Sequence, residues 1–367
     1  MKVILTGGCT GGHIYPALAI GDKFREMDPD CEVIYVAHQY GLETTIVPKA
    51  GYELKIVEAD WLRRDNPAVL AKTLITTSKG ARQARKIMKD FKPDVVVSTG
   101  SFVSVPVVLA AIEKGVPFYM HEQNGFPGVS NRSFANKANK IFLGFESARK
   151  YFKDKDKVIY SGNPVRSDFR DRDKLADRKE LGIPEENLVI TVFGGSLGSD
   201  TTNQIGMALI KEFGGKSGYT IVFGTGKNYY EEVTAELAKD GLDKFDNVRV
   251  NPYISDMPQV MSASDLLVSR SGALSVAEVT MAGRAAIFVP SPNVTADHQY
   301  YNAKAVADNG GAIIVRENDK TAETVLSEVR KLVNDRDGLA KMEKASAALA
   351  PTEAADIIYR TIMETYK

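Results

Sequence analysis

The feature that most constrains the fold of this chain is a regular alternation of short apolar runs with longer, helix-like segments. Runs such as Val3–Thr6 and Glu32–Val36 end near turn residues, and segments such as Tyr15–Arg25 and Asn66–Lys89 lie between the runs. Strands that alternate with helices along a chain form βαβ units and a mainly parallel sheet. The sequence therefore predicts an α/β protein.

The expected strands are spread over the whole chain. Those of the first half lie near Val3–Thr6, Glu32–Val36, Leu54–Val57, Val95–Ser98, Phe118–His121, Ile141–Leu143 and Val158–Ser161. Those of the second half lie near Val189–Phe193, Thr220–Phe223, Val248–Val250, Leu266–Ser269, Ala286–Val289 and Ala312–Val315. A further helix is expected over Tyr229–Lys239.

A weak internal duplication indicates two similar domains. The run Asp94–Ser98 (DVVVS) is followed by a Gly/Ser turn, a helix and a strand at Phe118. The run Asp265–Ser269 (DLLVS) is followed by the same order of elements up to a strand at Ala286. The lengths differ, so the two halves share an architecture and are not strict repeats.

The boundary between the domains is expected in segment 161–166, where a glycine and a proline interrupt the strand pattern. A chain of 367 residues is long enough for two hydrophobic cores. We therefore predict one domain at 1–163 and a second at 164–349.

Charge and cysteine content exclude several classes of function. The 47 Lys and Arg balance the 47 Asp and Glu, so no overall charge favours nucleic acid, and a membrane contact would need a local patch. Two cysteines cannot form a disulfide framework, and the four histidines show no metal-ligand spacing.

The N-terminus lacks the apolar region of a signal peptide, and the apolar stretch 102–112 is too short to span a bilayer. We expect a cytosolic protein with no metal site and no nucleic-acid partner.

A glycine turn, Gly7–His13 (GGCTGGH), follows the first expected strand. Glycines let the backbone approach a ligand closely, and the helix expected from about Tyr15 offers free N–H groups to an anion. The pattern is neither GxGxxG nor GxxxxGK[ST], so it predicts neither a dinucleotide site nor a P-loop. The alternative is a plain turn capped by Thr10, in which His13 is only a polar residue near a helix start. The position of His13 favours the functional interpretation.

A second glycine turn, Phe193–Gly198 (FGGSLG), occupies the corresponding place in the second half. Ser196 could bond a phosphate oxygen, or it could cap the next helix, which is the better interpretation of this turn taken alone. Two such turns at matching points of two α/β halves favour a ligand, because ligands bind at the carboxyl ends of parallel strands.

Three further polar runs lie at the ends of expected strands. Gly272 precedes a helix that carries Glu278, which could bind a ribose diol or could be a solvated glutamate favoured by the helix dipole. The run 297–302 (DHQYYN) could bind sugar hydroxyls or form an exposed loop. The run His121–Asn124 (HEQN) is typical of a site, although surface loops carry such runs too.

The segment from Trp61 to Lys89 is basic and partly apolar. It contains several Lys and Arg residues but only one acidic residue, Asp65. Trp61 is the only tryptophan of the chain. Such a mixture suits the surface of an anionic bilayer. A solvated basic helix face whose apolar side lies in the core is the alternative.

Together these motifs resemble one family, the UDP-N-acetylglucosamine:undecaprenyl-diphosphoryl-muramoyl-pentapeptide N-acetylglucosaminyltransferases of peptidoglycan synthesis, or MurG family. The resemblance extends from Gly7 to about Ala312. In chain order, its motifs are GGCTGGHIYPALAI, HEQN, GNPVR, FGGS, SGAL and DHQ. HEQN and GGH within one chain make the match specific.

The resemblance implies a GT-B architecture, in which two Rossmann-like domains face each other across a cleft and a helix within 350–367 returns to the first domain. The second domain would bind UDP-N-acetylglucosamine, and the first would face the lipid-linked muramoyl-pentapeptide acceptor and the inner face of the cell membrane. The enzyme would convert lipid I to lipid II and would need no cofactor.

The resemblance also implies residue roles. On the donor side, Arg166 and Ser196 would meet the diphosphate, Ile254 the uracil, Glu278 the ribose and Gln299 the sugar hydroxyls. The acceptor side and the sugar would be lined by Thr10, Gly11, Gly12, His13 and Asn124.

The implied reaction is a single displacement at the anomeric carbon that turns an α-linked sugar into a β-linked one. His13 is the candidate base for the acceptor hydroxyl, and Arg166 is the candidate group for stabilising the leaving diphosphate. No DxD pair with acidic neighbours marks a metal site, so we expect a metal-independent reaction.

Three positions depart from the family pattern. Cys9, Ser101 and Val105 stand where the family has glycine, and all three are expected to affect the acceptor side more than the donor side.

Two other functions share some of these features. A UDP-N-acetylglucosamine 2-epimerase has a similar two-domain fold but isomerises its substrate, and a non-catalytic scaffold protein would bind UDP without turnover. Acceptor-dependent release of UDP separates these functions from the transferase.

Overall fold

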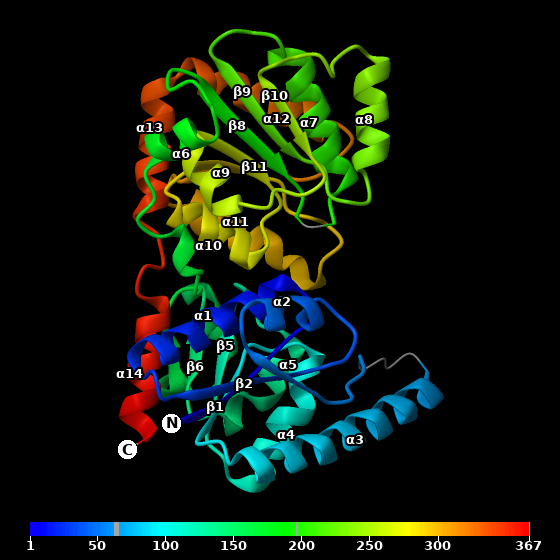
Figure 1. The fold of residues 1–367 in the computed structure, drawn as a ribbon, viewed down its shortest axis with the longest axis vertical. Coiled ribbons are helices and arrows are strands. Elements are labelled where there is room, and N and C mark those ends of the chain that lie inside the picture. The colour runs from blue at the N-terminus through cyan, green and yellow to red at the C-terminus, as the bar shows by residue number, and fades with distance from the viewer. Residues whose placement is uncertain (62–65, 196, 367) are drawn as a thin grey trace. The chain divides into compact units, whose positions relative to one another are not determined.

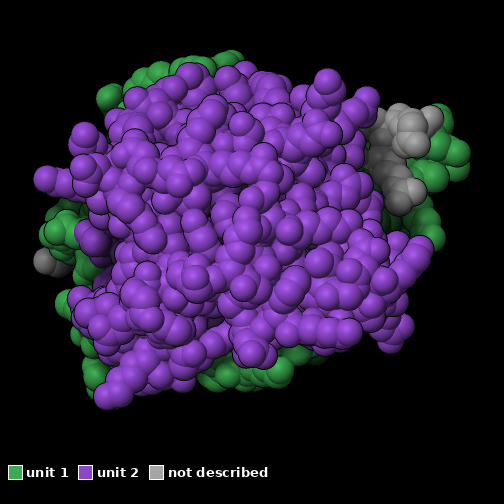
Figure 2. Space-filling model, turned by 90° about the horizontal axis from the view of Figure 1, so that it is seen from above, with its two compact units in different colours: residues 1–166, 353–367 green, residues 167–352 purple. Residues whose placement is uncertain are grey.

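The computed structural model describes residues 1–61, 66–195 and 197–366, and it divides into two compact units (Figures 1 and 2). Unit 1 consists of residues 1–166 together with 353–367, and unit 2 consists of residues 167–352. Each unit is built on its own parallel sheet with helices, which confirms the predicted α/β class with two Rossmann-like domains.

Unit 1 has a seven-stranded sheet in the order β3-β2-β1-β4-β5-β6-β7. Its strands are β1 Lys2–Thr6, β2 Glu32–Ala37, β3 Glu53–Ile56, β4 Val95–Ser98, β5 Phe118–Glu122, β6 Ile141–Leu143 and β7 Val158–Tyr160. Its α-helices are α1 Gly11–Met27, α2 Glu43–Lys49, α3 Pro67–Phe91, α4 Val105–Lys114, α5 Val129–Phe134 and α14 Ala354–Tyr366. The short 3₁₀ turns are η1 Phe102–Ser104, η2 Ala135–Lys137, η3 Glu146–Tyr151 and η4 Lys155–Lys157.

Unit 2 has a six-stranded sheet in the order β10-β9-β8-β11-β12-β13. Its strands are β8 Leu188–Phe193, β9 Tyr219–Gly224, β10 Val248–Asn251, β11 Leu266–Ser269, β12 Ala285–Phe288 and β13 Ala312–Ile314. Its helices are α6 Lys174–Glu180, α7 Asp200–Phe213, α8 Tyr230–Lys239, α9 Met257–Ala263, α10 Ala273–Met281, α11 His298–Ala307, α12 Thr321–Asn334 and α13 Arg336–Ala347, with 3₁₀ turns η5 Ser167–Phe169 and η6 Thr295–Asp297.

The two sheets share one topology. Counted within its own unit, each sheet runs 3-2-1-4-5-6, and unit 1 adds β7 at the edge. The predicted duplication is therefore real, because β4 and β11 hold the same place in their sheets. In such sheets the strand order reverses between the first and fourth strands, and ligands bind at the carboxyl ends there. The fold predicts one such position beside β1 and β4, and another beside β8 and β11.

The sheets are buried on both faces, which explains why the strands could be recognised as apolar runs. In β1, Val3 and Leu5 pack in a core layer with residues of α1, whereas Ile4 packs in the opposite layer with residues of α3 and α4. All three side chains are fully buried. Alternate residues of a strand point to opposite faces, so both sides of the sheet need apolar cover.

The last helix, α14, packs on α1. The Tyr359 ring lies 5.1 Å from the Phe24 ring, and the Asp356 carboxylate lies 2.7 Å from the Lys23 ammonium group. Ile358 is fully buried in the same core layer as Val3. Burial of one such side chain contributes roughly 1.5–3 kcal/mol, so α14 is an integral part of unit 1.

The helix α1 begins earlier than the sequence indicated. We expected it from about Tyr15, whereas it starts at Gly11, so that Gly12 and His13 lie in its first turn. Two adjacent glycines are poor helix formers, and the sequence pattern therefore resembled a loop. Contacts with the neighbouring strand ends hold this turn in place, as described below.

No helix within the described residues is long and apolar enough to cross a membrane. Within the same residues, no cluster of three or more His, Cys, Asp or Glu side chains is suited to holding a metal ion.

Candidate active site

The glycine turn of unit 1 needs its first glycine for a steric reason. A Cβ atom at Gly7 would lie 2.0 Å from the hydroxyl oxygen of Thr99, so a larger residue fits there only if the Thr99 side chain moves. Thr10 is exposed and has an extended backbone (φ −131°, ψ 156°), and within the described residues its side chain makes no capping hydrogen bond. Thr10 therefore holds the N-cap position that the alternative interpretation gave it, but it does not cap α1 through its side chain.

His13 lies where the carboxyl ends of β1, β4 and β5 converge. Its Nδ1 atom is 2.8 Å from the backbone oxygen of Thr99, which follows β4, and 3.1 Å from Oε1 of Gln123, which follows β5. The Thr99 hydroxyl donates a 2.7 Å hydrogen bond to the backbone oxygen of His13. The imidazole is half-buried. It lies at the ligand position that the sheet topology predicts beside β1 and β4.

The HEQN run turns mostly inward. His121, Glu122 and Gln123 are buried, and only Asn124 is half-buried. The Glu122 carboxylate accepts hydrogen bonds from the backbone N–H groups of Asn124 (3.0 Å) and Gly128 (2.9 Å) and thereby shapes the loop after β5. We interpreted all four as a site, with an exposed surface loop as the alternative; the burial of three of the four side chains rules out an exposed loop.

Burial of His121 has an electrostatic consequence. Desolvation lowers the pKa of His121 to about 4, although its hydrogen bond to the backbone of Gly162 acts in the opposite direction. His121 is therefore neutral at physiological pH.

Arg166 is associated with α1. Its guanidinium carbon lies 5.1 Å from the centre of the Tyr15 ring, one helical turn beyond Gly11. This distance permits a cation–π contact. The structure thus brings Arg166 close to the helix that carries Gly11, Gly12 and His13.

In unit 2, a cavity of about 320 Å³ lies at the carboxyl ends of β8, β11 and β12. It is lined by the second glycine turn, the start of α7, the turn before α10, and the start of α11. Its lining residues are Phe193, Gly194, Gly195, Gly198, Ser199, Arg270, Gly272, Ser275, Ser291 and Gln299. This is the second ligand position that the sheet topology predicts. Ser196 belongs to the same turn but lies outside the described residues.

Gly198 is needed in this turn for its conformation. Its φ is +82°, and a Cβ atom there would lie 2.1 Å from the backbone oxygen of Thr225. A side chain at this position would be both strained and in collision with the strand-end loop after β9.

Arg270 is a site residue that sequence analysis missed. It follows β11 directly and donates hydrogen bonds to the hydroxyl of Ser199 (2.7 Å) and the backbone oxygen of Val289 (3.1 Å), and it pairs with Glu317. A fixed, largely buried guanidinium at the wall of this cavity can attract an anion. A cation directly after a buried strand was the signal that could have revealed it.

The other predicted donor residues have different surroundings. Gln299 lines the cavity, and its Oε1 accepts a 3.0 Å hydrogen bond from the backbone of Ser291. Glu278 is half-buried on α10 and is not one of the described residues that line the cavity. The Ile254 side chain packs in the core with Val189 and Val222, so a ligand would meet Ile254 through its backbone.

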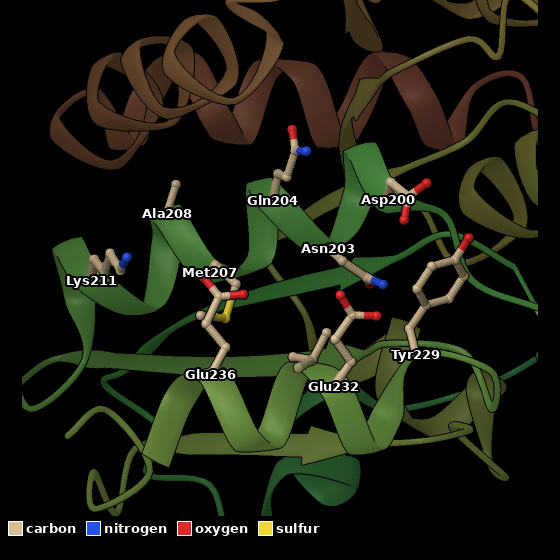
Figure 3. A pocket seen from close by; sticks show the side chains of 10 residues that line it. Asp200, Asn203, Gln204, Met207, Ala208, Lys211, Tyr229, Glu232 and Glu236 are labelled. Atoms are coloured by element: carbon tan, nitrogen blue, oxygen red, sulfur yellow. The ribbon is translucent and has the colours of Figure 1, made fainter. Parts of the chain in front are cut away.

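A second cavity of about 360 Å³ lies between α7 and α8 (Figure 3). The side chains of Asn203 and Glu232 point toward each other across it. None of the predicted site residues in the described part of the chain lines this cavity, so it is not the candidate active site.

The three departures from the family pattern fall into two classes. Cys9 and Ser101 have positive φ angles of 72° and 71°, which explains why glycine suits both positions. Ser101 combines this φ with a ψ of 164°, a region that is essentially restricted to glycine. Val105, in contrast, is the first residue of α4 and has ordinary helical angles.

Ser101→Gly is therefore expected to raise the free energy of unfolding by about 1 kcal/mol. Relief of a backbone strain of about 1–3 kcal/mol outweighs the added entropy of glycine in the unfolded chain. Val105→Gly, a matched control, is expected to lower the free energy of unfolding by up to about 1 kcal/mol, because glycine disfavours helix. Urea unfolding of both variants checks this, and equal destabilisation by the two substitutions would refute strain at Ser101.

Comparison with known proteins identifies the family. Residues 3–143 match the glycosyltransferase family 28 N-terminal domain, and residues 189–360 match the glycosyltransferase family 28 C-terminal domain. The UDP-N-acetylglucosamine--N-acetylmuramyl-(pentapeptide) pyrophosphoryl-undecaprenol N-acetylglucosamine transferase of Acetivibrio thermocellus is 37% identical over 370 residues, covering 100% of this chain and 99% of that protein.

Solved structures agree with this match. The crystal structure of Acinetobacter baumannii MurG is similar with a TM-score of 0.75 and 27% identity, covering 99% of each chain. UDP-GlcNAc 2-epimerase from Neisseria meningitidis is similar with a TM-score of 0.72 over 99% of this chain and 100% of that chain, but its 16% identity shows only a shared fold. The chain therefore belongs to the family of UDP-N-acetylglucosamine--N-acetylmuramyl-(pentapeptide) pyrophosphoryl-undecaprenol N-acetylglucosamine transferases, the MurG family.

Proposed function

We propose that this chain transfers N-acetylglucosamine from UDP-N-acetylglucosamine to the muramoyl 4-hydroxyl of undecaprenyl-diphosphoryl-muramoyl-pentapeptide, which converts lipid I to lipid II. Family membership supports the reaction. The observation that carries the catalytic part is His13, which hydrogen bonds hold at the convergence of three strand ends.

The two units divide the substrates in this proposal. Unit 2 holds the donor, with Arg270 and the glycine turn, including Ser196, near the diphosphate. Ile254 meets the uracil through its backbone, Glu278 the ribose, and Gln299 the sugar. Unit 1 presents Thr10, Gly11, Gly12, His13 and Asn124 to the acceptor and the sugar, and Arg166 to the diphosphate.

The chemistry is an inverting displacement. The acceptor oxygen forms a bond to the anomeric carbon while the bond from that carbon to the diphosphate oxygen breaks and UDP leaves. His13 takes the proton of the acceptor hydroxyl. His13 lies in the first turn of α1, at the carboxyl ends of the strands where the sheet topology predicts a ligand. Arg166 and the backbone N–H groups of the glycine turn stabilise the negative charge that develops on the diphosphate.

A surface of unit 1 supports contact with the inner face of the cell membrane. Trp61, Leu74 and Ile75 expose 54–60% of their surface. Other residues of α3, such as Ala84 and Met88, pack in the core with α4. The side chains of Trp61, Leu74 and Ile75 are therefore not part of the core. Exposed Lys72, Lys79 and Arg82 lie on the same helix. We call these six residues, five on α3 and Trp61 ahead of it, the α3 surface; Arg63 and Arg64 of the predicted basic stretch lie outside the described residues.

An assay of UDP release tests both parts of the proposal. UDP release is expected to require the lipid-linked acceptor. With acceptor in anionic vesicles, turnover should fall as salt approaches about 1 M, where charges are screened within ~3 Å. Replacing Lys72, Lys79 and Arg82 with glutamine should lower turnover on anionic vesicles roughly ten- to a hundredfold, because each cation contributes about 1 kcal/mol near such a surface.

Two controls make this assay decisive. The same variant should turn over detergent-dispersed acceptor at the rate of the unmodified enzyme. Replacing the exposed Lys239, Lys244 and Lys341 of unit 2 with glutamine should have no effect on either form of acceptor. Equal turnover on neutral vesicles at high salt would refute the electrostatic contact, and UDP release that is independent of acceptor would refute the transfer reaction.

A further inference from the structure

A buried chain of hydrogen bonds leads from His13 into unit 1. Nδ1 of His13 is 3.1 Å from Oε1 of Gln123, and Nε2 of Gln123 is 2.9 Å from Nδ1 of His121. Nε2 of His121 is in turn 3.1 Å from the backbone oxygen of Gly162. Gln123 and His121 are at least 99% buried, so water does not compete for these bonds.

The orientation of the Gln123 amide follows from one backbone carbonyl. Its Nε2 atom also lies 3.1 Å from the backbone oxygen of His121, and a carbonyl oxygen can only accept. The amide nitrogen must therefore occupy this position, and the amide oxygen must face His13. The orientation is determined by the hydrogen-bond partners, which is the way that amide groups are assigned.

The tautomer of His121 follows in the same way. The amide of Gln123 donates to its Nδ1, which must therefore be the unprotonated nitrogen. Its Nε2 faces the carbonyl of Gly162 and must therefore carry the hydrogen. Both assignments agree with a neutral imidazole.

These two assignments determine the proton position on His13. Its Nδ1 faces two atoms that can only accept, the backbone oxygen of Thr99 at 2.8 Å and Oε1 of Gln123 at 3.1 Å. Nδ1 therefore carries the hydrogen in the neutral ring, and Nε2 keeps the lone pair. Within the described residues, Nε2 of His13 forms no hydrogen bond.

We propose that Gln123, oriented by His121, is a positioning residue that keeps the proton of His13 on Nδ1 and so makes Nε2 the basic nitrogen. The proposal rests on the proposed role of His13 as base. It assigns a function to two buried residues of the HEQN run that do not themselves meet the acceptor. The proton of the acceptor hydroxyl passes to Nε2 of His13, and the resulting imidazolium keeps its Nδ1–H bonds to Thr99 and Gln123.

Four other titratable groups lie on the described elements around His13. Glu122 accepts hydrogen bonds from the loop after β5, and Glu43 accepts one from the backbone of Cys9. Arg166 lies over Tyr15, and His121 is neutral. A substitution at Gln123 removes the hydrogen bonds to His121, whereas the contacts named here for Glu122, Glu43 and Arg166 do not involve the Gln123 side chain.

The tautomers can be read directly by ¹⁵N NMR of the histidine side chains in the unmodified full-length protein. We expect Nδ1–H for neutral His13 and Nε2–H for His121. An Nε2–H tautomer of neutral His13 would overturn the proposal. This measurement requires no variant and no activity, so it can fail independently of the proposed reaction.

Gln123→Glu provides the kinetic test. A carboxylate beside Nδ1 of His13 favours the imidazolium, so the acid limb of the kcat–pH profile should move to higher pH by about one unit or more. Gln123→Met removes the hydrogen-bonding groups without adding charge; it should lower kcat roughly tenfold, less than the 10²–10⁴-fold expected for loss of a base.

A charge-matched control is available in unit 2. Gln204 is exposed on α7, and Gln204→Glu should leave the acid limb unchanged. An acid limb that stays in place in Gln123→Glu, with only thermal stability lowered, would show a purely structural role for Gln123 and overturn the proposal.

Discussion

Replacing His13 with alanine is expected to lower kcat by roughly 10²–10⁴-fold while donor affinity stays nearly unchanged. The imidazole is the proposed base, and its contacts are to Thr99 and Gln123 within unit 1, whereas the cavity proposed to hold the donor, which we call the donor cavity, lies in unit 2. Steady-state kinetics with saturating acceptor, together with titration of UDP binding, separates these two effects.

The dependence of kcat on pH provides a second test of His13 as the base. A base must be neutral, so kcat of the unmodified enzyme should fall on the acid side as His13 becomes protonated, and this acid limb should vanish in His13→Ala. If His13 only orders the loop, the loss should appear as lower stability or a higher acceptor KM, with the acid limb intact. A His13→Ala enzyme with near-normal kcat would leave the proton of the acceptor hydroxyl to another group.

The second large effect is expected on the donor side. Glu278→Ala should raise the KM for UDP-N-acetylglucosamine by one to two orders of magnitude. Hydrogen bonds from a ribose diol to a carboxylate contribute about 1.5–3 kcal/mol, and Glu278 sits half-buried on the helix that begins directly after Gly272 of the donor cavity.

The matched control for this substitution is Glu323→Ala. Glu323 is exposed in the first turn of α12 and does not line the donor cavity, so its removal should leave the donor KM unchanged. Thermal melting of both variants should show little change. An unaltered donor KM in Glu278→Ala would refute the proposed ribose contact.

The strands were predictable for a simple physical reason. A parallel sheet that is covered on both faces needs continuous apolar runs, and all the expected strands occur within one or two residues of their predicted bounds. The start of α1 was not predictable, because Gly11 and Gly12 have low helix propensity. Tertiary hydrogen bonds between Thr99 and His13 hold that turn, and a linear sequence does not display them.

The candidate site was predictable in its positions but not in its side-chain directions. Both glycine turns stand at the carboxyl ends of the strands where the topology reverses, as expected. Neighbouring polar residues such as Glu122 and Asn124 look alike in a sequence, but one is buried and the other half-buried. Ile254 shows the same limit, since its side chain belongs to the core.

The return of α14 to unit 1 has a consequence for the order in which the protein folds during synthesis. Residues 1–166 leave the ribosome first, but the helix that covers Phe24 and contributes Ile358 to their core is made only after all of unit 2. Unit 2 is continuous in the chain and can complete its core as soon as it has emerged. The unit that begins to form first is therefore completed last, and the apolar side chains of α1 that pack on α14 stay uncovered until that helix has been made.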